Sequence, residues 1–205
     1  MARKARSLHK EFCAKIAALN RTRLNFESAF RASIINEGDI GQAYAGLCVE
    51  VFASIENLIG TLFIGMLNGS IKHENGQVSI LVTIRPVSMI ENIILNSKTY
   101  MEWLPFSDNT LARAKSYFSE GRPFTLLTEE QKGKIKNYTK IRNAIAHKSK
   151  KAESEFNTLI SGLILLPFEK SPQGYLRNIP NRATGKTQLE IIMDDVTIIS
   201  SVLCC

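Results

Sequence analysis

Apolar residues recur at helical spacing along most of the chain and form two long periodic segments in its first third. The first segment runs from about residue 2 to residue 35. The second begins at Asp39, which stands three positions before Gln42 as in a capping box. The apolar faces comprise Leu8, Phe12, Ile16, Leu19, Phe26, Phe30 and Ile34 in the first segment, and Tyr44, Leu47, Val51, Ile55, Leu58 and Leu62 in the second. Each pattern predicts a long amphipathic helix.

Shorter helical patterns follow, several of them opened by a residue that favours a helix start. Proline is favoured in the first turn of a helix, and Asp or Thr accepts a hydrogen bond from the unpaired backbone amides there. Helices are predicted from Pro86 to about Ser97, from Asp108 to the turn at 120–123, from Thr128 to about Lys148, from Glu153 to Leu166 and after Asp194. The fold class is therefore predicted to be all-α.

Two segments depart from the helical pattern. Residues 77–84 are short and β-branched, which favours an extended conformation. Residues 167–187 are rich in Gly, Pro, Asn and basic residues, which predicts a loop or hairpin. With 205 residues, 44% of them hydrophobic, the chain can bury a full core. We therefore predict one domain spanning residues 1–205, a helical bundle with irregular loop or hairpin excursions.

The most apolar stretch, residues 43–67, is interrupted by Glu50 and Glu56, which leaves too short a clean run to span a bilayer. The basic N-terminus lacks the continuous apolar core of a signal peptide. The cysteines show no paired spacing typical of a zinc site or a secreted disulfide framework; they are Cys13, Cys48, Cys204 and Cys205. We expect a soluble cytoplasmic protein without membrane contact, bound metal or other cofactor.

The net charge of +7 is concentrated in two basic blocks. Residues 2–24 contain seven basic side chains and one acidic side chain, Glu11, and residues 131–151 contain eight basic side chains and no acidic one. Such blocks favour a polyanionic partner, although a solvated helix face is an equally ordinary explanation for the first block. The second block surrounds a titratable side chain, His147.

The segment from Lys140 to Lys148, KIRNAIAHK, places chemically useful side chains on one helix face. At about 100° per residue, Arg142, Asn143 and His147 lie on a polar side, with Asn143 and His147 as surface neighbours. The opposite side carries Tyr138, Ile141 and Ile145, which we expect to anchor the helix in the core. This arrangement separates the residues that hold the helix from the residues that could meet a ligand.

These residue types suit the cleavage of an RNA phosphodiester. An imidazole can take or give a proton near neutral pH, a guanidinium pairs with phosphate, and an amide can orient either group. The 2′-hydroxyl of RNA is an internal nucleophile, so the reaction needs no metal-activated water. The alternative is that His147 lies at a helix C-terminus only because the helix dipole favours a cation there. Spacing alone leaves both explanations open.

The run Arg142–His147 resembles the R-x-x-x-x-H signature of HEPN-domain ribonucleases. The resemblance is strong over residues 112–150 and weak before residue 40 and over residues 60–100. Four further segments resemble the bacterial branch of this superfamily that occurs in conflict and antiphage systems: ARAKSYFSEGRPFTLL at 112–127, ASIENLI at 53–59, GYLRNIP at 174–180 and TGKTQLE at 184–190.

This resemblance implies a HEPN-like helical bundle that forms a homodimer, with the motif helices of two protomers facing each other across one RNA cleft. It implies metal-independent endoribonuclease activity on tRNA or mRNA, by 2′-hydroxyl attack, as a toxin or antiphage-defence effector. Arg142 and His147 would be the catalytic pair and Asn143 their positioning partner. Glu56 would orient Arg142, or would be a buried structural glutamate. The lysines expected to hold RNA phosphates are Lys136, Lys140 and Lys148.

Two other functions fit the same residues. The chain could be a non-catalytic HEPN module that binds RNA or a nucleotide, or a scaffold dimer. It could also be an enzyme kept silent by an antitoxin or another defence-system protein. Gly185-Lys186-Thr187 resembles the end of a phosphate-binding loop, but Pro180 replaces the first glycine of that pattern, so we exclude an ATPase. We expect His9 and His73 to lack partners and Trp103 to belong to the core.

Overall fold

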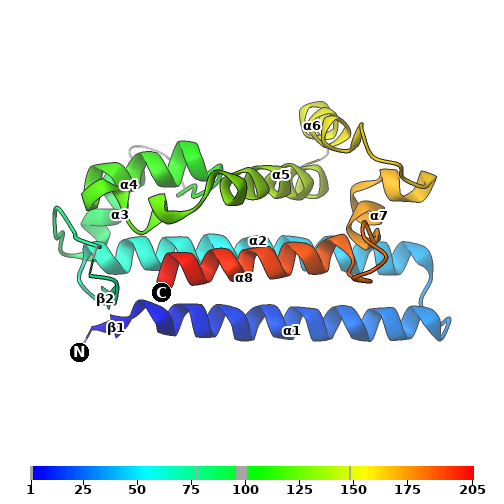
Figure 1. Cartoon of the computed structure of the whole chain (residues 1–205), viewed down its shortest axis with the longest axis horizontal. Coiled ribbons are helices and arrows are strands. Elements are labelled where there is room, and N and C mark those ends of the chain that lie inside the picture. Colours follow the sequence, from blue (N-terminus) through cyan, green and yellow to red (C-terminus); the bar gives the residue numbers. More distant parts are fainter. Residues whose placement is uncertain (1, 77, 96–100, 148) are drawn as a thin grey trace. The chain divides into compact units, whose positions relative to one another are not determined.

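The structure is a computed structural model that describes residues 2–76, 78–95, 101–147 and 149–205 (Figure 1). Helices account for 72% and strands for 4% of the described structure, which confirms the all-α fold class. The helices are α1 (Ala5–Arg31), α2 (Glu37–Leu67), α3 (Val87–Leu95), α4 (Ala112–Tyr117), α5 (Glu129–Ala146), α6 (Lys150–Ile160), α7 (Pro172–Arg177) and α8 (Gln188–Cys204). Two short parallel strands, β1 (Arg3–Lys4) and β2 (Ile71–Lys72), pair with each other.

The two long N-terminal helices and the motif helix form as predicted. Helices α1, α2 and α5 each lie close to the residue ranges expected from the apolar spacing. Thr128 and Gln131 cap α5, since the Gln131 amide donates to Thr128 Oγ1 at 3.2 Å and the Thr128 amide donates to Gln131 Oε1 at 2.9 Å. These helices depend on local patterns, which sequence periodicity captures.

Several predicted helix boundaries are wrong. Helix α2 begins at Glu37 and not at Asp39, because Asn36 and Asp39 cap it through hydrogen bonds between side chain and backbone of 3.0 Å in both directions. Helix α6 begins at Lys150 and not at Glu153. Asp108 does not start the fourth helix, because it lies inside a π-helix at Phe106–Leu111 that precedes α4. Helix α6 ends at Ile160 and not at Leu166, because the chain turns there and the Leu163 amide donates to the Ile160 carbonyl at 3.0 Å. Helix α8 begins six residues before Asp194, at Gln188.

The two predicted excursions are only partly irregular. Residues 167–187 contain a 3-10 helix at Pro167–Lys170 and helix α7, which Ser171 caps by accepting from the Gly174 amide at 3.1 Å. Within residues 78–84, Ile80 forms an isolated antiparallel bridge to Phe118, and the chain forms no longer strand there. The prediction of a loop or hairpin over residues 167–187 is therefore wrong at α7, because a helix of six residues is too short to show a helical period in the sequence.

The chain divides into two compact units, each built from separate segments. Unit 1 comprises Met1–Cys13, Ser54–Lys136 and Thr197–Cys205, and unit 2 comprises Ala14–Ala53 and Asn137–Val196. Helices α1, α2, α5 and α8 contribute residues to both units. The prediction of one domain over residues 1–205 stays a prediction.

Unit 1 has an aromatic centre around Phe63 of α2. The Phe63 ring lies 4.9 Å from Phe118, 5.2 Å from Trp103 and 5.3 Å from Phe124, measured between ring centroids. Trp103 is buried, as the sequence predicted. These rings bury a large apolar area and fix the irregular chain around α4 against α2.

In unit 2, the later part of α1 and the first part of α2 form an antiparallel pair joined by the turn at 32–36 (Figure 1). By length and composition, α2 as a whole is the one described helix that could cross a membrane, although 56% of its most apolar window is buried in the structure. Such burial also occurs in core helices of soluble proteins, so the localisation stays a prediction.

Candidate functional site

The part of α5 that lies in unit 2 is held by its apolar side. Tyr138 and Ile141 are 7% and 1% exposed, and the Tyr138 hydroxyl donates a short hydrogen bond to Asp195 of α8. Burial and the neighbouring Asp195 carboxylate raise the pKa of Tyr138, so the hydroxyl keeps its proton. Ile145 is only half-buried, which makes its predicted anchoring role wrong in part. The anchored residues orient the motif side of the helix.

Arg142 is half-buried and is held by its neighbour in the sequence. Its Nη1 donates to Oδ1 of Asn143 at 3.1 Å. The buried Cys48 thiol of α2 lies close enough to Arg142 to feel its charge: burial raises the pKa of Cys48 to about 12, and Arg142 opposes this rise. The guanidinium therefore lies within electrostatic range of α2, and the hydrogen bond to Asn143 is positioned to fix its orientation.

His147 follows the last residue of α5 and is exposed. Its backbone amide donates to the Asn143 carbonyl at 2.8 Å, which continues the helical hydrogen-bond pattern by one residue. Its imidazole makes no hydrogen bond to any residue that the structure describes. Its place at the helix C-terminus also fits the alternative in which the dipole alone favours a cation.

The remaining predicted site residues are distributed over the two units. Lys140 is half-buried in unit 2, on the same helix as Arg142. Glu56 and Lys136 belong to unit 1, where Glu56 is half-buried and Lys136 exposed. Lys148 lies outside the described residues. The structure thus joins Arg142 to Asn143, and the roles of Glu56, Lys136 and Lys148 stay predictions.

The segments GYLRNIP and TGKTQLE have structural roles in unit 2. The Gly174 position has no room for a side chain, since an added Cβ would lie 1.9 Å from the Phe168 carbonyl oxygen. Arg177 pairs with Glu27 at 3.4 Å. Thr187 and Glu190 cap α8, because the Thr187 amide donates to Glu190 Oε2 at 2.9 Å. These contacts within the protein account for the glycine, arginine, threonine and glutamate of the two segments, and none of them involves a ligand.

A buried polar network in unit 2 was not predicted. Arg23 is 4% exposed and donates from Nη2 to Glu190 at 2.6 Å and from Nη1 to the Tyr44 hydroxyl at 3.3 Å. The Tyr44 hydroxyl donates to Glu27 at 2.8 Å, and burial is the main reason that its pKa rises to about 12. The signal in the sequence was the position of Arg23, four residues after Leu19 on the apolar face.

The first basic block is largely paired with carboxylates inside the protein. The pairs are Arg3 with Glu11, Lys4 and Arg6 with Glu74, Lys15 with Glu50, and Arg23 with Glu190. Five of the seven basic side chains in residues 2–24 thus have an acidic partner, which favours a structural role for this block over binding of a polyanion.

His9 and His73 have hydrogen-bond partners, contrary to our expectation. His9 Nδ1 lies 2.8 Å from Ser200 Oγ, and His73 Nε2 lies 3.0 Å from the Leu203 carbonyl oxygen. Both contacts hold the last turns of α8 in unit 1, so neither imidazole is available as a free catalytic group. Among the described residues, no group of three or more His, Cys, Asp or Glu side chains is arranged to hold a metal ion.

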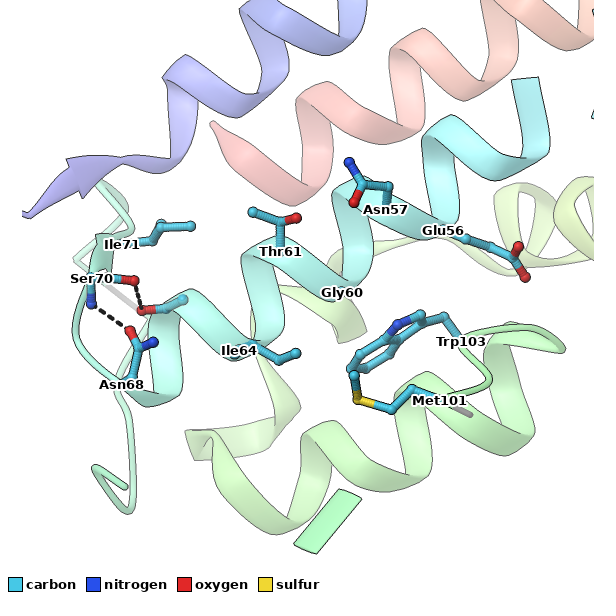
Figure 2. Close-up of a pocket in the computed structure, with 11 residues that line it drawn as sticks. Glu56, Asn57, Gly60, Thr61, Ile64, Asn68, Ser70, Ile71, Met101 and Trp103 are labelled. Atoms are coloured by element: carbon cyan, nitrogen blue, oxygen red, sulfur yellow. Dashed lines mark hydrogen bonds between the residues drawn. The ribbon is translucent and has the colours of Figure 1, made fainter. Parts of the chain in front are cut away.

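Unit 1 also contains a cavity of about 370 Å³ beside α2 (Figure 2). Asn57, Thr61 and Ile64 of α2 line it together with Met101 and Trp103. Glu56 lies at one end, so this residue has a place in unit 1 that the sequence did not predict. The cavity is a second candidate site.

No known protein family matches this sequence, and no curated protein and no solved structure matches it. The HEPN resemblance therefore rests on Arg142, Asn143, His147 and their sequence context alone.

Proposed function

We propose that the protein is a metal-independent endoribonuclease of the HEPN type that acts as a homodimer. One observation carries this proposal: Arg142 is oriented by Asn143 on a firmly anchored helix, and the exposed His147 follows within a helical turn of Asn143. The basic run around these residues contains no acidic side chain, which favours RNA as the ligand. The residue types then supply both charge stabilisation and proton transfer.

The proposed reaction is a transesterification within the RNA. The 2′-hydroxyl oxygen attacks the adjacent phosphorus, and the bond from phosphorus to the 5′-oxygen breaks. The products are a 2′,3′-cyclic phosphate and a 5′-hydroxyl. One imidazole accepts the 2′ proton, and a protonated imidazole gives a proton to the departing 5′-oxygen. Arg142 pairs with the non-bridging phosphate oxygens, where negative charge develops.

A homodimer supplies the number of groups that this reaction needs. One copy of the motif contributes a single imidazole, whereas acid and base catalysis at the two oxygens calls for two. In a two-fold dimer, each protomer contributes the same Arg142, Asn143 and His147 to a shared cleft.

We propose tRNA or mRNA in the cytoplasm as the substrate. We also propose a toxin or antiphage-defence role, with an antitoxin or defence-system protein as the regulator.

The second candidate is a HEPN module that binds RNA without cutting it. The position of His147 at the C-terminus of α5 favours this candidate, because the helix dipole there stabilises a cation whether or not it reacts. Arg142 and Lys140 would then hold phosphates.

The test is incubation of the purified protein with tRNA and with total RNA in EDTA, beside Arg142→Ala and His147→Ala. Arg182→Ala, a change at an exposed arginine of unit 2, is the matched control. We expect fragments with 2′,3′-cyclic phosphate ends from the wild type and the control only. Absence of wild-type fragments, or equal cleavage by the folded motif variants, contradicts an endoribonuclease. Retention of RNA without fragments supports the binding module.

The dimer has a separate test. Light scattering at the assay concentration should give twice the mass of the 22.9 kDa chain. If both imidazoles are needed, wild type refolded with an equal amount of His147→Ala should have about a quarter of the wild-type activity per total protein, since random pairing leaves that share of intact dimers. A monomer with full cleavage activity would contradict the composite site.

A further inference from the structure

Four large apolar side chains are exposed in the segment of unit 2 that joins α6 to α7 (Figure 1). Ile164 is fully exposed, and Leu163, Leu166 and Phe168 are each about half exposed. We call these four residues the 163–168 patch. Single apolar side chains on a protein surface are ordinary, whereas a cluster of large ones is typical of a surface that meets a partner.

Hydrogen bonds fix the backbone beneath the 163–168 patch. The Leu166 amide donates to Glu169 Oε2 at 2.8 Å, and the Glu169 amide donates to the Leu166 carbonyl at 3.0 Å. The Phe168 carbonyl accepts a hydrogen bond from Ser171 Oγ at 3.0 Å. The apolar side chains are therefore presented by an ordered turn, which lowers the entropy cost of binding a partner.

The charge of this segment limits the class of partner. Residues 161–168 contain no Lys, Arg, Asp or Glu, although the chain has a net charge of +7. Two copies of such a chain repel each other, and they can approach most closely where the surface is uncharged. An anionic lipid surface instead favours apolar residues accompanied by an excess of Lys and Arg. The nearest charged residues in the sequence are Glu155 on one side and Glu169 and Lys170 on the other, which give no basic excess.

The 163–168 patch belongs to the same unit as the motif. Helix α6, which separates the patch from the end of α5, has 11 residues and is therefore about 16 Å long. Phe156 of α6 is buried, and its ring lies 5.8 Å from the ring of Tyr175 of α7. The helices at both ends of the patch are thus packed together. A two-fold contact at the patch would also set the distance between two copies of Arg142 and His147.

We propose that two copies of this chain pair through the 163–168 patch. In a two-fold dimer the patch meets its own copy, so apolar side chains are buried against apolar side chains and no charge loses its partner. A stable interface of ordinary size covers about 800 Å² on each partner and has an apolar centre with a polar rim. The four apolar side chains supply the centre. Only the link between this pairing and a shared RNA cleft rests on the proposed function, whose site is incomplete in one copy.

The pairing is tested by sedimentation velocity of the full chain without RNA. Ile164→Ser and Leu166→Ser should each raise the dissociation constant of the dimer roughly 30- to 1,000-fold, because each change acts twice in a two-fold interface and a few central side chains carry most of the binding energy. Leu24→Ser is the matched control, since Leu24 lies on α1 in the same unit and is also about half exposed. This control should dimerise as the wild type does.

A cross-link gives a second readout that does not depend on weakening the dimer. Cys205 is an exposed free cysteine, so Cys205→Ser serves as the background. In this background, Ile164→Cys should give a covalent dimer with a short bismaleimide linker, whereas Leu24→Cys should not. Equal cross-linking at the two positions would contradict the patch as the place of contact.

Unit 1 carries a competing apolar surface on α3, where Met89 and Ile93 are about half exposed. The double variant Met89→Ser with Ile93→Ser should leave the dissociation constant unchanged. The proposal is overturned if this variant abolishes the dimer while the folded patch variants keep it, or if the wild type sediments as a 22.9 kDa monomer. A wild-type monomer that binds phosphatidylserine vesicles through the patch would assign the patch to a lipid surface instead.

Cleavage assays on the same variants separate this proposal from the proposed function. A dimer that is lost in Ile164→Ser but cuts no RNA keeps the surface and contradicts the nuclease. If Ile164→Ser loses both the dimer and cleavage while Arg142→Ala loses only cleavage, the patch acts by pairing the two copies of the motif. Full cleavage by a monomeric Ile164→Ser protein supports pairing through the patch and contradicts the composite site.

Discussion

The guanidinium of Arg23 on α1 donates to the carboxylate of Glu190 on α8 at 2.6 Å, inside unit 2. These residues are 167 positions apart in the sequence, and Arg23 is 4% exposed. Glu190 also caps α8 through the Thr187 amide, so one side chain both starts the helix and binds it to α1. The Arg23–Glu190 pair therefore links the start of α8 to the packing of α8 against α1.

We predict that Arg23→Met lowers the free energy of unfolding by about 3 kcal/mol, because the partly buried Glu190, whose side chain is 21% exposed, loses its cationic partner. Denaturant unfolding followed by circular dichroism measures this change. Lys15→Met is the matched control: Lys15 and Glu50 are 3.4 Å apart but 51% and 56% exposed, and such pairs contribute about 1 kcal/mol or less. Equal effects of the two substitutions would contradict a structural role for the Arg23 pair.

We predict opposite effects of alanine at two glycines of unit 2. Gly174→Ala should destabilise the protein by about 2 kcal/mol or more, because the new Cβ meets the Phe168 carbonyl oxygen. Gly46→Ala, in the interior of α2 with nothing within 4 Å, should stabilise it by about 0.5–1 kcal/mol. Thermal unfolding of both variants beside the wild type tests the pair. A neutral Gly174→Ala would show that α7 does not pack as described.

Acid should destabilise unit 1 through His73. The Asn75 amide donates to His73 Nδ1 at 3.1 Å and Nε2 faces the Leu203 carbonyl, so the neutral ring with its proton on Nε2 satisfies both contacts. Burial lowers the pKa of His73 from its ordinary value of 6.5, against the opposing effects of the Leu203 carbonyl and Glu74. The unfolded chain then binds more protons than the folded one as the pH falls below 6.5, so stability decreases in that direction.

We therefore predict that His73→Gln flattens the dependence of the free energy of unfolding on pH between about 7.5 and 5.5. The burial of His9 lowers its pKa as well, so a residual slope should remain in this variant and become smaller in the double variant with His9→Gln. Urea unfolding at a series of pH values measures the slopes. An unchanged slope in both variants would exclude these imidazoles as the cause.

The proposed RNA contact of Lys140 predicts a specific salt dependence. Lys140→Gln should weaken binding of a non-cleavable 2′-O-methyl RNA and reduce the slope of log Kd against log salt concentration by about 0.7–1, the loss of one phosphate contact. Lys170→Gln, an exposed lysine of unit 2 outside the motif helix, should leave this slope unchanged. Filter binding from low to moderate salt distinguishes the two, and equal slopes for Lys140→Gln and wild type would remove Lys140 from the interface.

Local patterns were sufficient for the long helices and for the orientation of the motif. The helical period of α1, α2 and α5 is visible in consecutive turns, since each turn buries a residue on the same side. Tyr138 and Ile141 are buried as this period predicted, which places Arg142 and Asn143 on another face of α5. The residues proposed for catalysis were likewise identified from sequence, because their motif is contiguous.

Only the tertiary structure showed the contacts that join distant segments. From the sequence, Arg23 was one of many basic residues, and its pairing with Glu190 could not be predicted. The close packing of Trp103 on Gly60 was likewise not predictable from the sequence. The cavity beside α2 arises from the same long-range packing. Sequence alone thus determined the helices, which depend on neighbours within a few turns. The Arg23–Glu190 pair and the cavity depend on contacts between residues that are tens to more than a hundred positions apart. Helical periodicity carries no information about such contacts.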